Sequence, residues 1–217
     1  MPKERIGVVL SGGGAKGAGQ LGMMKYVYET GVRPSYISGI SVGSLNATLW
    51  AQEENLDLLE ALWRGIKGNS DVYRKNWFRP WKLYRSLFDN KPLKRKIKKY
   101  INPNKLKTSP IELQIGVVQL QSGTYRTVDK FHSDYISMLL ASTAIPPWFA
   151  PLEKDDQLII DGGGLSNLPI EPALTLGATE IVALDLMNDP ASLPKNTLAT
   201  TQHLEKLAFA VLRRQVF

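Results

Sequence analysis

Short apolar runs and segments of helical periodicity alternate along most of the chain, and most of the runs stop at glycine, serine or aspartate. Runs typical of buried strands lie at residues 5–10, 36–40, 157–160 and 180–186. Helical periodicity is found at residues 15–29, 41–50, 135–144, 170–176 and 202–215. A hairpin is expected from residues 111–120 and 124–128. The alternation predicts an α/β fold of three layers, in which helices cover both faces of a mostly parallel sheet.

The composition is that of one ordinary globular domain, and we expect residues 1–217 to form it. Hydrophobic residues make up 43% of the chain, no signal peptide is visible, and no apolar stretch reaches the roughly 20 residues of a membrane span. There is no cysteine, which excludes disulfides and a cysteine nucleophile, and the two histidines are too far apart in sequence to indicate a metal cluster. We therefore expect a cytoplasmic protein with no metal and no cofactor.

Positive charge is concentrated in one segment, residues 64–107. This segment holds fifteen Lys and Arg against Asp71 and Asp89, a net charge of +13, whereas the rest of the chain carries −6. Prolines divide it into predicted helical pieces, and Trp and Phe are interleaved with the cations. A basic, aromatic-containing insertion of this kind is typical of a lid or a membrane-facing cap, and we expect residues 77–101 to contact an anionic membrane. A solvated helix face is the alternative, and nucleic acid ranks below a membrane because no nucleic-acid-binding module surrounds the segment.

Candidate chemistry begins where the second predicted strand meets the second predicted helix. Gly39-Ile40-Ser41-Val42-Gly43 matches GxSxG at this junction, which is the context of a nucleophile elbow. Glycine is needed on both sides because side chains there would collide with the strand and the helix, and the turn lifts the serine Oγ clear of the backbone. We therefore predict Ser41 as the nucleophile, with Gly39 and Gly43 permitting the turn. A structural glycine-rich turn is the alternative.

A second glycine-rich turn, Gly12-Gly13-Gly14-Ala15-Lys16-Gly17, follows the first predicted strand. Its GxGxxG spacing also occurs in dinucleotide-binding loops, but no acidic residue ends the second strand where a ribose partner belongs. A P-loop fits poorly, because Ala18-Gly19 stand where Lys and Ser or Thr are required. We interpret the turn as an oxyanion hole, in which backbone N–H groups of Gly12, Gly13, Gly14 and Val42 hold a developing negative oxygen. A protein that binds nucleotide phosphate at this loop is the less favoured alternative.

Asp161-Gly162-Gly163 ends a third predicted strand. An aspartate in this position is, by itself, most often a turn former. Active sites, however, gather at the carboxyl edge of such sheets, and three motifs end three predicted strands. We therefore expect Asp161 to lie beside Ser41 as its catalytic partner.

Taken together, these motifs resemble those of the patatin-like phospholipase family. Ser11 and Lys16 stand where many members have Asp and Arg, and the chain ends at Phe217, earlier than longer members do. The resemblance rests on GGG-x-[KR]-G at Gly12–Gly17, GxSxG at Gly39–Gly43, D-G-[GA] at Asp161–Gly163, the stretch Ala141–Pro146, and Asn167-x-Pro169.

The resemblance implies a patatin-like fold and a Ser41–Asp161 dyad that hydrolyses acyl esters of phospholipids, lysophospholipids or other lipids. In such a dyad Asp161 is the general base, and the reaction passes through an acyl-enzyme. An exposed aspartate is a weak base for a serine hydroxyl, so the site must be apolar enough to raise its basicity, and Pro146–Phe149 are the candidates for that wall.

Two alternatives stay open within the enzyme class. The chain order Ser41…Asp161…His203 fits a triad of the α/β-hydrolase type, although His203 is expected on a solvated helix face, and His132 fits the order less well. An acyltransferase would use the same acyl-enzyme and pass the acyl group to an acceptor other than water.

Overall fold

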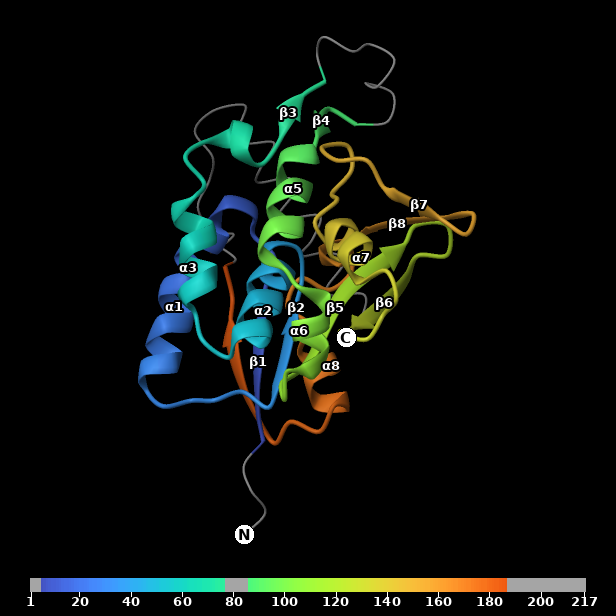
Figure 1. The fold of residues 1–217 in the computed structure, drawn as a ribbon. Coiled ribbons are helices and arrows are strands. Elements are labelled where there is room, and N and C mark those ends of the chain that lie inside the picture. The colour runs from blue at the N-terminus through green and yellow to red at the C-terminus, as the bar shows by residue number, and fades with distance from the viewer. Residues whose placement is uncertain (1–4, 77–85, 187–217) are drawn as a thin grey trace, which may run out of the picture.

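A computed structural model describes residues 5–76 and 86–186 and places a seven-stranded sheet at the centre of the molecule (Figure 1). The strands of this sheet are β1 (Ile6–Leu10), β2 (Tyr36–Gly39), β5 (Glu112–Gln119), β6 (Thr124–Asp129), β7 (Leu152–Lys154), β8 (Gln157–Asp161) and β9 (Glu180–Leu184). Their hydrogen-bonded order is β7-β8-β5-β2-β1-β9, and β6 pairs with β5 off this path.

The sheet has a parallel half and an antiparallel half. Strands β9, β1, β2 and β5 run parallel to one another, whereas β6 and β8 run antiparallel to β5, and β7 antiparallel to β8. The predicted α/β class and the hairpin of β5 and β6 are therefore confirmed. Strand β7 was not predicted, and the alternation pattern gave no indication that β8 is reversed.

Helices cover both faces of the sheet. The larger layer contains α1 (Gly17–Glu29), α2 (Val42–Glu53), α3 (Asp57–Arg64), α5 (Lys91–Tyr100), α6 (Pro103–Thr108) and α7 (Tyr135–Ser142). Helix α8 (Ile170–Thr175) packs against β1 and β2 on the opposite face, where the missing side chain of Gly7 leaves room for Ala173. Val8 and Leu10 point the other way, into the main core.

Helix α2 is the centre of the larger layer. Eleven of its twelve residues are buried, all except Glu53, because the sheet, α3, α6 and α7 surround it. A helix that is covered on every side shows little amphipathic periodicity, and its apolar and small residues fit that position. Since Ser41 directly precedes α2, the candidate nucleophile is held by the most buried helix of the described structure.

The basic insertion differs in part from its prediction. Helices α5 and α6 are present, and Pro92 and Pro103 lie in their first turns, where proline is tolerated. Helix α3 ends at Arg64, where the insertion begins, and was not predicted. A two-stranded antiparallel sheet of β3 (Arg74–Lys75) and β4 (Phe88–Asp89) stands where only helical pieces were expected. Residues 77–85 and the predicted helix at 202–215 lie outside the described residues.

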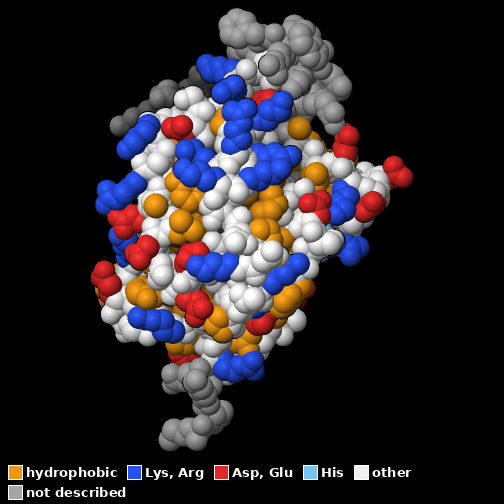
Figure 2. Space-filling view, in the orientation of Figure 1, with side chains coloured by type: hydrophobic (Ala, Val, Ile, Leu, Met, Phe, Trp, Pro, Cys, Tyr) orange, Lys and Arg blue, Asp and Glu red, His pale blue; other side chains and the backbone are white. Residues whose placement is uncertain are grey.

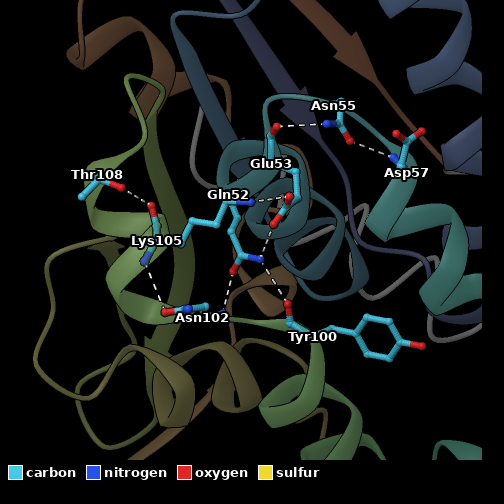
Figure 3. A network of polar contacts seen from close by, with 8 residues as sticks. All are labelled: Gln52, Glu53, Asn55, Asp57, Tyr100, Asn102, Lys105 and Thr108. Carbon is cyan, nitrogen blue, oxygen red and sulfur yellow. Dashed lines mark hydrogen bonds and ion pairs between the residues drawn. The ribbon is translucent and has the colours of Figure 1, made fainter.

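A polar network fastens α5 and α6 to the end of α2 (Figure 3). The Gln52 side chain donates to the Tyr100 carbonyl at 3.1 Å and accepts from the Asn102 N–H at 2.7 Å. Lys105 pairs with Glu53, and this pairing lowers the pKa of the Glu53 carboxyl. The insertion is thereby tied to the helix that follows Ser41.

Candidate active site

Ser41 occupies a sharp turn between β2 and α2, as GxSxG predicts. Its φ of 54° and ψ of −126° form a conformation that L-residues rarely adopt. A side chain on Gly39 would approach the Gly43 carbonyl oxygen to 2.5 Å, and one on Gly43 would approach the Leu10 carbonyl oxygen to 2.4 Å. Both flanking glycines are therefore required by close backbone contacts, and the turn is a nucleophile elbow in geometry.

The glycine loop after β1 lies directly against the elbow, because β1 and β2 are parallel neighbours. A side chain on Gly12 would come within 3.1 Å of the Ser41 Cβ and 2.5 Å of the Asn167 Oδ1. The Gly12 N–H donates to the Asn167 carbonyl at 3.2 Å. The prediction of Gly12 as an oxyanion donor is therefore corrected, because its backbone N–H is already engaged. This hydrogen bond instead anchors the loop.

The remaining three predicted donors are available in the structure. Within residues 5–76 and 86–186, no hydrogen bond engages the backbone N–H of Gly13, Gly14 or Val42. Gly14 has a φ of 57°, the left-handed region that glycine adopts without strain. Gly17 is buried, and a side chain there would collide with Val42 at 2.2 Å, so this glycine lets α1 approach the elbow.

Strands β2 and β8 approach each other head to head along one edge of β5. Gly39 at the end of β2 is opposite Ile115 of β5, and Asp161 at the end of β8 is opposite Val117. Strand β6 pairs with β5 from Gln114 to Gln119, so it occupies the other edge and leaves β2 and β8 on the same one. Asp161 therefore reaches the predicted edge of the sheet from the direction opposite to that of β2.

The meeting point of the two strands is Gly116. A side chain on this residue would lie 2.2 Å from both the Ile40 Cδ1 and the Tyr125 hydroxyl, and one on Gly162 would lie 2.7 Å from the Gly116 carbonyl carbon. The lone glycine in the predicted strand at 111–120 was the available signal, because glycine inside a strand often marks a close approach of backbone. Sequence reasoning gave it no role.

Ser142, at the end of α7, fills the gap that the two strand ends leave. Its hydroxyl donates to the Gly116 carbonyl at 2.7 Å and accepts from the Ser41 N–H at 3.2 Å. The side chain is fully buried, so it satisfies two backbone groups that strand pairing does not reach. Sequence reasoning included Ser142 only within the stretch Ala141–Pro146 and missed its position behind Ser41.

Asp161 is buried beside the Ser41 hydroxyl. Its side chain is 2% exposed, and its Oδ1 accepts from the Gly163 N–H at 2.7 Å. Burial raises the pKa of Asp161 to about 7, and the Ser41 hydroxyl and the Gly163 N–H oppose that rise by stabilising the charged form. The Asp161 Oδ2 accepts no hydrogen bond of standard geometry, so the Ser41 hydroxyl interacts with the carboxyl group more loosely than a well-formed hydrogen bond would.

An apolar cavity of about 360 Å³ opens beside Ser41. Its volume lies within the usual range for small-molecule sites. Phe149 of the predicted apolar wall is among its lining residues, whereas a contact between Pro146–Phe149 and Asp161 stays a prediction. The other residues that line it are Gly14, Ala15, Val42, Leu45, Trp63, Ile66, Lys67, Gly68, Asn69, Val72, Tyr73, Leu93, Thr143 and Ile145.

A buried polar chain positions one wall of this cavity. The Trp63 indole N–H donates to the Asn46 Oδ1 at 3.0 Å, and the Asn46 amide donates to the Gln20 Oε1 at 2.9 Å. Gln20 in turn donates to the carbonyls of Ser11 and Leu184 at the ends of β1 and β9. The cavity wall is thus tied to the carboxyl edge of the sheet.

Of the two histidines, His132 lies within the described residues and His203 does not. The His132 Nδ1 accepts from the Asp134 N–H at 3.0 Å. His132 follows β6. Because β6 runs antiparallel to β5, it ends near the start of β5, whereas Ser41 lies at the carboxyl end of the parallel strands. His203 lies outside the described residues, so the triad alternative that uses it stays a hypothesis.

Fold and site together define a class of α/β proteins that carry a serine at a strand-to-helix elbow, beside a glycine-rich loop and a buried carboxyl group. The chain belongs to the patatin-like phospholipase family, whose model matches residues 8–174. This confirms the resemblance stated from the motifs, and the family supports lipid acyl hydrolase activity in general.

Relatives and a solved structure agree with this assignment. The chain is 29% identical over 187 residues to Neuropathy target esterase sws of Drosophila melanogaster, and 26% identical over 188 residues to Patatin-like phospholipase domain-containing protein 6 of Homo sapiens. Each match covers 83% of this chain but only 13% of the relative. VipD from Legionella pneumophila has a similar fold, with a TM-score of 0.56 at 17% identity over 84% of this chain and 49% of VipD. None of the helices in the described residues is long and apolar enough to span a bilayer.

Proposed function

We propose that this chain hydrolyses lipid acyl esters, with Ser41 as the nucleophile and Asp161 as the general base. The observation that carries the proposal is the head-to-head meeting of β2 and β8, which brings the Ser41 hydroxyl to a buried carboxyl group. Burial raises the pKa of Asp161 to about 7, and a general base is most effective when its pKa lies near the working pH.

In the acylation half of the proposed reaction, the Asp161 carboxylate takes the Ser41 proton while Oγ attacks the ester carbonyl carbon. The backbone N–H groups of Gly13, Gly14 and Val42 are the candidate donors to the oxyanion, since they are free of other hydrogen bonds in the described structure. When the tetrahedral intermediate collapses, the ester bond breaks, and the leaving alcohol takes the proton from Asp161. The fatty acyl group is then bonded to Oγ.

In the deacylation half, Asp161 accepts a proton from water as the water oxygen attacks the acyl carbon. The bond to Oγ breaks, the fatty acid leaves, and the proton returns from Asp161 to Ser41. No histidine is required at any step. A carboxyl group with an ordinary pKa would be a weak base for this work, so burial of Asp161 is part of the mechanism.

The cavity supports a substrate with a fatty acyl chain. Most of its lining is apolar, with Leu45, Trp63, Leu93 and Phe149 among the residues that form it, and Ser41 also lines it. Lys67, Gly68 and Asn69 add a polar section, which suits the headgroup or alcohol end of a phospholipid or lysophospholipid. Burial of the chain in this cavity supplies binding energy in proportion to the apolar area removed from water.

Labelling with a fluorophosphonate probe, followed by turnover of p-nitrophenyl esters, lysophospholipids and diacyl phospholipids, tests the proposal. We expect Ser41→Ala to abolish labelling, and both Ser41→Ala and Asp161→Asn to lower kcat by about 10⁴-fold or more, as in other interlocked catalytic units. Ser133→Ala, which changes an exposed serine after β6, is the matched control and should retain full activity.

Two outcomes would overturn the assignment of roles. Asp161→Asn with most of its activity would exclude the dyad. Loss of activity in His203→Asn together with retention in Asp161→Asn would point to another base.

A further inference from the structure

The outer face of α5 carries cations that no acidic side chain of the described residues neutralises. The helix contains six Lys and Arg and no acidic residue. In the described part of the chain, no carboxylate pairs with four of them, and all four are exposed to solvent. These four residues, which we name the α5 cationic face, are Lys94, Arg95, Lys98 and Lys99.

The other two cations of the helix have carboxylates nearby. Lys91 lies 3.9 Å from Asp89, and Lys96 lies 4.0 Å from Asp71 and donates to the Gly65 carbonyl. Elsewhere in the larger helical layer some exposed cations are paired, for example Lys105 with Glu53. Within the described residues, one side of α5 therefore groups four of the segment's cations that no carboxylate pairs.

Figure 2 shows this localisation on the surface. Lys and Arg side chains gather in the upper half of the view, over the position of α5 in Figure 1, whereas acidic side chains are mixed with basic ones lower down. Arg74 and Lys75 of β3 are exposed next to the start of the helix and extend the positive region. Such a region attracts anionic surfaces and is screened by salt.

The inner face of α5 belongs to the core and to the cavity beside Ser41. Leu93 and Ile97 are 8% and 0% exposed, and Leu93 lines the cavity. An interfacial helix needs a free apolar face to enter the lipid, and α5 has none. Leu93 and Ile97 are therefore not available to insert into lipid, and what the helix offers to a partner is charge.

The helix is held at both ends. At its start, the Leu93 N–H donates to the Val72 carbonyl at 3.1 Å. At its end, Gln52 binds the Tyr100 carbonyl, as Figure 3 shows. The α5 cationic face therefore lies on a helix that is fixed at both ends. Its first residue, Lys94, directly follows Leu93, which lines the cavity.

We propose that the α5 cationic face binds the anionic surface of a lipid membrane and so places the cavity next to the lipid from which its substrate comes. This proposal rests on the proposed function, because a lipid substrate would explain both the α5 cationic face and the apolar cavity. A nucleic acid would use the same charges, but it would leave the adjoining apolar cavity without a role. Binding is electrostatic and peripheral, and each Lys or Arg near the surface of such a membrane strengthens it by about fivefold.

The experiment is vesicle cosedimentation of the Ser41→Ala chain, which leaves the lipid intact. The vesicles are phosphatidylcholine alone or phosphatidylcholine mixed with phosphatidylglycerol, each at low and at high salt. We expect binding only to the mixed vesicles and loss of that binding at high salt. Adding Lys94→Gln, Arg95→Gln and Lys98→Gln should weaken it by on the order of a hundredfold.

The matched control removes three exposed cations from other elements, with Arg33→Gln, Lys107→Gln and Arg126→Gln. This control should bind vesicles nearly as well as its parent. Equal losses in both triple variants would mean that net charge, not this face, governs binding and would overturn the proposal. Binding to a labelled DNA duplex but not to mixed vesicles would also overturn it.

Soluble p-nitrophenyl ester turnover, measured with Ser41 intact, separates this proposal from the proposed function. The α5 triple variant should keep that turnover, since its side chains are exposed and do not line the cavity. If the soluble ester is hydrolysed and mixed vesicles are not bound, the membrane proposal fails alone. If the soluble ester is not hydrolysed at all, the proposed function fails whatever the vesicles show.

Discussion

The elbow around Ser41 and the α5 cationic face are opposite in the burial and the pairing of their polar groups. Around Ser41, polar groups are buried and almost all are paired with a defined partner, as Ser142 is with two backbone groups. On the α5 cationic face, the charged groups are exposed, and none of them pairs with a carboxylate of the described residues. The first arrangement can shift a pKa and hold a strained turn, because burial makes each contact strong. The second can only attract a distant charge, and salt weakens it. Substitutions in the two regions should therefore differ in kind.

The largest expected effect on stability comes from Asp161→Asn. The pKa of Asp161 is about 7 in the folded chain, above its ordinary value of 3.8, so the folded state holds a proton that the unfolded state has released. The contribution of Asp161 to wild-type stability should therefore fall as the pH rises from about 4 to about 7, by roughly 4 kcal/mol. Asparagine carries no charge and can still accept from the Gly163 N–H.

The measurement is urea unfolding of both proteins at several pH values. At pH 8, Asp161→Asn should be the more stable chain, and the difference should close below about pH 4. A stability difference between the two proteins that stays constant between those values would show that Asp161 has no raised pKa. Removal of the three α5 cations should produce no comparable pH dependence in this range.

A smaller effect is expected from Gly116→Ala. The new methyl group would meet the ends of the Ile40 and Tyr125 side chains at 2.2 Å, and both must move to accommodate it. We expect a loss of about 1–3 kcal/mol in the free energy of unfolding, as for other overpacked sites. Esterase activity should fall as well, because Ile40 directly precedes Ser41.

The control for Gly116→Ala is Gly22→Ala, because nothing lies within 4 Å of the Cβ position of residue 22. Gly123→Ala is unsuitable as a control, since Gly123 has a φ of 63°. The Gly22→Ala variant should keep both activity and stability. If Gly116→Ala kept both activity and stability, as Gly22→Ala should, the close approach of β2 and β8 at Gly116 would be contradicted.

An effect of similar size is expected from Ser142→Ala. Loss of the hydroxyl leaves the buried Ser41 N–H and Gly116 carbonyl without partners, which costs about 1–3 kcal/mol in stability. If Ser142 holds the elbow in position, kcat should fall about tenfold with KM nearly unchanged. A stability loss with unchanged kcat would assign Ser142 a structural role only. Thr48→Val, which removes another buried hydroxyl, at the Tyr135 contact, is the control.

The parts of this site that sequence predicts are those encoded locally. GxSxG at a strand-to-helix junction specifies the elbow, because the steric demands on Gly39 and Gly43 come from the turn itself. The glycine loop and Asp161 were likewise recognisable as strand ends. Each of these features depends on a few neighbouring residues.

What sequence could not predict depends on pairing between distant segments. An apolar run such as 157–160 pairs equally well in either direction, so the reversal of β8 was not visible. That reversal is what makes Gly116 a meeting point and gives Ser142 its two partners. The short strands β3 and β4 were missed because each pairs over only two residues. The candidate oxyanion donors could be separated from Gly12 only once Asn167 was placed.

The pH dependence of kcat/KM for a soluble p-nitrophenyl ester tests the central claim most directly. If Asp161 is the base for Ser41, kcat/KM should rise about tenfold per pH unit in the acidic range and level off above about pH 7, and His203→Asn should show the same profile. A profile that stays flat through pH 7, or a limb near pH 7 that disappears in His203→Asn, would contradict the Ser41–Asp161 dyad.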